Sequence, residues 1–325
     1  MILLLMKVLV GLLLMAAFSL PLTVIVVNIQ LLDEPMSLLV FNMTLIYYVF
    51  GVSFFLIGMT DVLYPEGVPP PVCAAAMHFS MAMAVGLKVA ALSVAVDQFI
   101  GVVHSLRYYA IMDVWKWKMV FLTWFCMAMM VLFCLACYLL DLETSDEYFL
   151  RLFGIQPSNE ECRMLGVTHL TNIVLEVVLL VTSLSSAVLF IHTAIQGVKQ
   201  ERRIASRNIV DTSSRFFVRF KSFKRIVKLL LTVLALDILG TGFRIARSWN
   251  PQMSATQLVH LVRVLCLILE GWTYGLSSPA VRAAFRSFFG CIKRQTPVSR
   301  IVPGNGLPLQ VRPALAWQPS GRERF

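Results

Sequence analysis

The stretch PVCAAAMHFSMAMAVGLKVAALSVAVDQFIGVV, residues 71–103, decides the fold class of this chain. Its formal charges are confined to Lys88 and Asp97, and most of the remainder is apolar. A helix needs about 20 residues to cross the hydrocarbon core of a bilayer, so this segment is long enough to span it. The stretch therefore predicts a transmembrane α-helix.

Six further apolar blocks flank this stretch, and they predict helices at 8–31, 37–60, 116–140, 167–196, 223–247 and 256–277. Hydrophobic residues make up 58% of the chain and charged residues 14%, which excludes a soluble globule. Lipid offers no partners to backbone amides, and runs such as Leu229-Leu230-Leu231 lack the alternation of a barrel strand. We expect an all-α membrane protein, a seven-transmembrane helix bundle forming one domain over residues 1–290.

A short amphipathic eighth helix is predicted from Ala280 to Gly290. Arg282 and Arg286 lie there at helical spacing beside phenylalanines, a pattern typical of a helix on the membrane surface. Cys291 follows it and is either a palmitoylation site or an unmodified cysteine. Residues 291–325 are rich in proline without apolar periodicity, which predicts a disordered cytoplasmic tail.

Basic residues are concentrated between the fifth and sixth predicted helices, where Glu201 and Asp211 are the only acidic residues. By contrast, residues 141–166 carry six acidic side chains and two arginines. Positive loops stay in the cytoplasm, so we expect a multi-pass plasma-membrane protein with its N-terminus outside and its C-terminus inside. Asp33 and Glu34 make the first cytoplasmic connection an acidic exception.

The net charge of +10 predicts contact with anionic inner-leaflet lipid and an acidic protein partner rather than nucleic acid. Alternatively, this charge only fixes the topology.

Four of the seven cysteines lie within apolar spans and are predicted to be packing residues. Cys73 and Cys162 both fall on the predicted outer side, an oxidising compartment, and predict a disulfide; the alternative is two unpaired thiols.

Several positions resemble those of rhodopsin-like (class A) G-protein-coupled receptors, in a divergent, orphan-type form. Cys73 precedes Asp97-Gln98-Phe99 by the spacing of that family's third helix, and Trp124 and Tyr274 match its fourth and seventh helices. The resemblance implies a receptor that transmits an extracellular ligand signal to heterotrimeric G proteins, without cofactor or metal. It also implies that Asp97, Gln98, Phe99 and Tyr274 belong to the G-protein-coupling face.

The chain departs from the family at informative places. Gln98 replaces the family's arginine, which makes the motif degenerate, and Tyr47 replaces its sodium-binding aspartate. The fifth and sixth helices lack their usual prolines. Asp97 is expected to accept hydrogen bonds from the second loop; alternatively, Asp97 and Gln98 are merely interfacial polar residues.

The resemblance also limits the ligand. Ser80 stands where receptors for amines have an aspartate, and residues 256–277 contain no lysine for a retinal Schiff base. Polar side chains near the predicted outer helix ends form the candidate ligand site: His78, Ser80, His169, Asn172, Arg244 and His260. Arg244 offers a contact to an acidic ligand, or its side chain extends to the lipid headgroups.

Three charges, Lys88, Asp237 and Glu270, are predicted to lie deep in the membrane. Lys88 precedes Asp97 by nine residues, which is about 13 Å along a helix. Charges at that depth are costly and usually have a partner or a water-filled cavity. Our hypothesis is a buried ion pair between Lys88 and Asp237 that acts as a switch; Glu270 is the rival partner, and hydration without pairing is the third possibility.

Two other function classes are alternatives to a receptor, an enzyme and a transporter. The chain lacks the His-Glu-x-x-His and Gly-x-Ser-x-Gly motifs, so we do not expect an enzyme. The two halves show no internal symmetry of the kind that transporters often have. An ion- or proton-linked transporter using Lys88, Asp237 and Glu270 nevertheless remains the alternative function.

Overall fold

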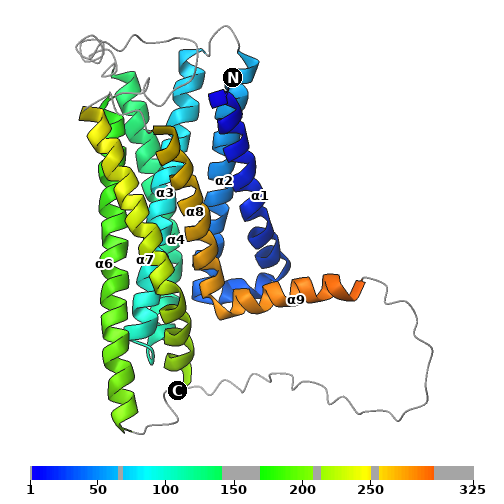
Figure 1. Ribbon diagram of the computed structural model, residues 1–325, viewed down its shortest axis with the longest axis vertical. Helices are drawn as coiled ribbons and strands as arrows, with labels where there is room; N and C mark the ends of the chain where they lie inside the picture. The colour runs from blue at the N-terminus through cyan, green and yellow to red at the C-terminus, as the bar shows by residue number, and fades with distance from the viewer. Residues whose placement is uncertain (1, 65–68, 141–168, 208–213, 250–255, 296–325) are drawn as a thin grey trace, which may run out of the picture.

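The computed structural model describes residues 2–64, 69–140, 169–207, 214–249 and 256–295 (Figure 1). These residues form helices joined by short connections, and no strand occurs within them. The helices are α1 (Ile2–Val27), the 3-10 helix η1 (Ile29–Asp33), α2 (Pro35–Leu63), α3 (Pro70–Val103), α4 (Tyr108–Leu139), α6 (His169–Arg207), α7 (Ser214–Trp249), α8 (Thr256–Ser277) and α9 (Pro279–Gln295). The all-α class is thus confirmed.

The described residues of all seven segments predicted to be transmembrane lie almost entirely in helices, but several boundaries were wrong. α6 continues to Arg207 rather than stopping at residue 196, and α7 begins at Ser214 rather than at residue 223. The reason is physical: hydropathy locates the edge of the hydrocarbon, whereas Lys, Arg, Gln and Glu beyond that edge are good helix formers. Figure 1 shows α6 projecting past the level of α9.

Five helices are long and apolar enough to cross a membrane. They are Lys7–Val27, Pro35–Leu63, Pro71–Val103, Tyr108–Leu139 and Ile173–Arg202. α7 has a shorter apolar segment, Leu229–Phe243, and α8 with α9 counts as a sixth candidate only if the two are taken as one bent span. The described part of the chain therefore has the character of a multi-pass membrane protein.

α3 lies at the centre of the packing. In its apolar window 78% of the residues are buried, compared with 28% for α4. The largest core cluster includes Phe18, Tyr47, Leu87, Phe190 and Tyr274, from five helices. Because α3 contacts α2, α4, α6 and α7, a charged residue on its inner face meets several helices at once.

α1 and α2 approach each other unusually closely through glycine. A Cβ atom added at Gly11 would lie 2.5 Å from the backbone nitrogen of Phe55, and one at Gly51 would lie 2.9 Å from the Cβ of Leu14. Small residues allow membrane helices to pack backbone against backbone in this way. Near the start of α1 the pair is also joined by an ion pair, with Lys7 Nζ 2.6 Å from Asp61 Oδ2.

α9 leaves α8 at an angle of 97°, and Figure 1 shows it extending sideways from the bundle. Ser278 caps its start, because the Ser278 hydroxyl accepts a hydrogen bond from the backbone N–H of Val281 at 3.3 Å. The Phe285 ring packs against Trp272 with centroids 5.9 Å apart. The helix ends at Gln295, so placing its end at Gly290 was wrong; residues 291–295 are helical, and residues 296–325 lie outside the described ranges.

Candidate functional site

Three buried charged side chains meet between α3, α7 and α8. Lys88 Nζ of α3 lies 2.8 Å from Asp237 Oδ2 of α7 and 3.1 Å from Glu270 Oε2 of α8. The side chains are 5%, 2% and 2% exposed, respectively. The ion pair predicted between Lys88 and Asp237 is present, and the rival partner Glu270 binds the same ammonium. We call these three residues the charge cluster.

Hydrogen bonds extend the charge cluster to two more helices. The Ser183 hydroxyl of α6 donates to Asp237 Oδ2 at 2.8 Å, and the Tyr47 hydroxyl of α2 donates to Glu270 Oε2 at 3.5 Å. The Tyr47 ring is held in place by stacking on Phe18 of α1, with centroids 4.4 Å apart. Five helices therefore contribute a polar group to one buried network, and a sixth supports it.

The cluster has two carboxyl groups for one ammonium. Glu270 Oε1 and Asp237 Oδ1 are both buried and make no hydrogen bond within the described residues, so the polar contacts of each carboxyl group in the charge cluster use one of its two oxygens. Removing charges from water costs several kcal/mol per ion, and only good geometry with further hydrogen bonds offsets that cost. If Lys88 kept only one of its two partners, α3 would be joined either to α7 through Asp237 or to α8 through Glu270. A contact with two such alternatives could act as a two-state interhelical switch.

A second polar contact joins the C-terminal part of α3 to the start of α4. The Tyr108 hydroxyl, at the start of α4, donates a hydrogen bond to Asp97 Oδ1 at 2.6 Å, so the expected contact of Asp97 with the second loop region is confirmed. Gln98 Nε2 lies 3.4 Å from Met36 Sδ of α2, and the Phe99 ring lies 5.5 Å from that of His192.

The four residues predicted for the G-protein-coupling face do not form one surface in this conformation. Asp97 and Tyr274 are buried, and the Tyr274 ring packs against Phe190 with centroids 5.9 Å apart. Gln98 and Phe99 are half-buried and point toward different helices, α2 and α6. Any shared surface therefore requires a rearrangement of the helices.

Replacing Tyr108 with phenylalanine is expected to lower the free energy of unfolding by about 1.5 kcal/mol, because it removes a buried hydrogen bond to a charged group. Chemical unfolding in detergent micelles measures the change. Tyr109→Phe is the matched control, since the Tyr109 ring is 53% exposed. Equal effects of the two substitutions would show that the Asp97 contact contributes nothing.

The predicted ligand residues are only partly described. Ser80 and His78 of α3 are buried, and the His78 ring meets Tyr138 edge-on at 6.5 Å. The side chains of His169, Asn172, Arg244 and His260 lie outside the described part of the chain. The candidate ligand site therefore stays a prediction.

The predicted cysteine roles are also only partly open to description. Cys126, Cys134, Cys137 and Cys266 lie in helices and are not in disulfides, in keeping with packing roles. Cys73 is not among them, and Cys162 lies outside the described residues, so the disulfide stays a prediction. Cys291 lies in α9, but its side chain is outside the described set, and palmitoylation likewise stays a prediction.

Sequence reasoning missed the Lys7–Asp61 pair and the hydroxyl groups of Ser183 and Tyr47. A usable signal existed for the Lys7–Asp61 pair, because a lysine inside an apolar block needs a partner.

Within the described helices, no three His, Cys, Asp or Glu residues are grouped as metal ligands. No family model matches the chain, and no curated protein matches it in sequence.

Proposed function

We propose that this chain is a divergent rhodopsin-like G-protein-coupled receptor that transmits an extracellular ligand signal to heterotrimeric G proteins. The observation that supports it best is the charge cluster, in which Lys88 joins α3 to both α7 and α8 at 2.8 and 3.1 Å. A buried ion pair between helices is a weak source of stability but a well-suited register or switch element. The spacing of Cys73 and residues 97–99 on α3 agrees with the same proposal.

The proposal includes a topology. It has seven transmembrane helices with α9 as an amphipathic helix on the inner membrane surface, the N-terminus outside, the C-terminus inside, and the chain in the plasma membrane. A Cys73–Cys162 disulfide then ties the acidic segment 141–166 over the outer end of the bundle. Peptide mapping under non-reducing conditions tests the disulfide, and a mass that fits only free thiols rejects it.

In the proposed mechanism, a ligand at the outer ends of the helices changes the packing of α7 against α3. Lys88 then loses Asp237 and keeps Glu270, so α3 stays fastened to α8 while α7 moves. At the basic end, α6 and α7 are joined by an exposed pair, with Lys224 Nζ 3.2 Å from Glu201 Oε2, which is easily broken because exposed pairs contribute at most about 1 kcal/mol. The movement exposes basic residues to an acidic G-protein surface.

The test is basal activation of a panel of G proteins in cells that display matched surface levels of wild type, Asp237→Leu and Gln98→Arg. We expect basal signal in the wild type and a higher signal in Asp237→Leu, because that variant releases α3 from α7. Gln98→Arg restores the family's missing charge and is expected to raise coupling further. Silence of all three variants at verified surface levels would reject the receptor proposal.

One observation favours the alternative, an ion- or proton-linked transporter. The cluster has one more carboxyl group than ammonium groups, and Glu270 Oε1 is buried without a hydrogen bond in the described structure. Membrane carboxyls of this kind often belong to proton or cation relays. Currents or gradient-driven uptake in proteoliposomes, abolished by Glu270→Gln, would replace the receptor proposal with this one.

A further inference from the structure

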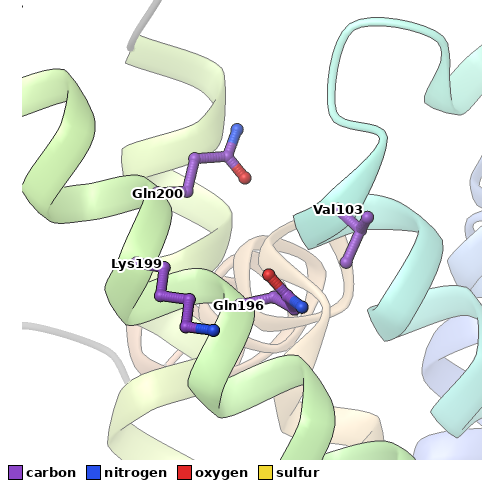
Figure 2. Close-up of a pocket in the computed structure, with 4 residues that line it drawn as sticks. All are labelled: Val103, Gln196, Lys199 and Gln200. Carbon is purple, nitrogen blue, oxygen red and sulfur yellow. The ribbon is translucent and has the colours of Figure 1, made fainter.

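A pocket lies where α3 and α6 end on the basic side of the bundle. It has a volume of about 360 Å³ and is lined by Val103 of α3 and by Gln196, Lys199 and Gln200 of α6. Figure 2 shows these side chains around the space between the two helices. None of these four described lining residues belongs to the charge cluster, and none of the four is acidic.

The depth of the pocket is that of lipid headgroups. Val103 is the last residue of one candidate span, and Gln196 and Lys199 fall in the last two turns of another, which ends at Arg202. The pocket therefore lies at the boundary between hydrocarbon and water, in the leaflet at the basic end. This end is predicted to be cytoplasmic.

One face of α6 leads from the pocket into the hydrocarbon. Ile191, Ile195 and Lys199 follow one another at four-residue intervals, so they share a face about 12 Å long. Ile191 and Ile195 are each 48% exposed, and Lys199 is exposed. Lys199 at the headgroup level and the two exposed isoleucines in the hydrocarbon complement the anionic head and the apolar chain of a lipid.

The Lys199 ammonium supplies the positive charge that an anionic headgroup needs. The acidic residue nearest in sequence, Glu201, is paired with Lys224 of α7 at 3.2 Å. Lys199 itself has no ion-pair partner among the described residues. Gln196 and Gln200 add amide groups that both donate and accept hydrogen bonds, which suits the hydroxyl groups of a sugar-like headgroup as well as a phosphate.

We propose that this pocket binds the headgroup of an inner-leaflet phosphoinositide, with its phosphate on Lys199, its inositol hydroxyls on the glutamine amides and an acyl chain along Ile195 and Ile191. The volume lies within the range of small-ligand pockets, about 300–1,000 Å³, and a protein helix about 10 Å across does not fit it. An acidic peptide is therefore the less suitable occupant. The site does not depend on whether the chain signals or transports.

Native mass spectrometry of the purified full chain, titrated with phosphatidylinositol 4-phosphate, phosphatidylserine or phosphatidylcholine, tests the proposal. We expect the phosphoinositide to be retained preferentially and Lys199→Ala to weaken its binding about tenfold, the loss of one charge-assisted contact. Gln196→Leu is expected to weaken it less. Lys118→Ala is the matched control, since Lys118 is an exposed lysine in the N-terminal half of α4 and does not line the pocket. Its Nζ lies 4.9 Å from the Trp115 ring centroid.

Each other outcome rejects the proposal. Equal losses in Lys199→Ala and Lys118→Ala would mean diffuse attraction to a basic surface, and no preference over phosphatidylcholine would mean no headgroup site. Glycerophosphoinositol 4-phosphate, which lacks acyl chains, should compete only weakly; competition as strong as that of the lipid would identify a free-phosphate site instead. Binding of an acidic peptide that needs Lys199, without lipid binding, would assign the pocket to a protein partner.

Discussion

Replacing Lys88 with methionine is expected to lower the free energy of unfolding by about 3–5 kcal/mol, because two carboxyl groups then remain buried without their cation. Asp237 and Glu270 are each 2% exposed and share the one ammonium, so neither can turn to water. Chemical unfolding in detergent micelles measures the loss. Surface expression should fall in parallel, since a loss of this size is a large fraction of the unfolding free energy of a typical domain.

Two further variants separate the cluster from a general effect of losing a lysine. Lys116→Met removes an ammonium that pairs with Asp113 at 2.6 Å, but the Asp113 side chain is 75% exposed, so we expect a loss below about 1 kcal/mol. Replacing Lys88, Asp237 and Glu270 together with methionine and leucines should restore most of the stability, because no buried charge is left. If Lys88→Met alone leaves stability and expression unchanged, the interhelical lock does not exist.

The charge cluster shows what the sequence could predict about the site. Counting nine residues back from Asp97 placed Lys88 in mid-membrane, and a similar count placed Asp237 at the same depth. Depth alone could not choose between Asp237 and Glu270, because it does not determine how each helix is rotated about its axis. In the structure the question has no single answer, since both carboxyls reach the same ammonium.

Other parts of the site carried no usable signal. Serine and threonine hydroxyls in apolar helices commonly bond to their own backbone, as Thr44 does to Val40, so Ser183 did not stand out. Tyr47 stood out only as the replacement of an aspartate, which indicated no partner for its hydroxyl. Their role depends on which helices are neighbours, which is a tertiary property. Helix type was predictable from apolar blocks, whereas the extensions of α6 and α7 were not, because they lie beyond the hydrocarbon edge where hydropathy has no bearing on helix length.

Replacing Gly11 with valine is expected to cost about 3 kcal/mol, at the upper end for overpacking, because the new side chain would meet backbone. Its Cβ would lie 2.5 Å from Phe55 N, 2.8 Å from Phe55 Cα and 2.9 Å from Gly51 O, and none of these atoms can move by a side-chain rotation. α1 must therefore separate from α2, which also strains the Lys7–Asp61 pair.

Gly242→Val in α7 is the matched control for Gly11→Val, because a Cβ atom there meets no atom of the described residues within 4 Å. We expect a change within about 0.5 kcal/mol, as for substitutions away from packed features. Both variants gain the same side chain in a helix, so their difference in unfolding free energy isolates the close approach of α1 and α2. Similar values for the two would mean that the helices tolerate separation, and that the glycines of α1 and α2 are not what holds this pair together.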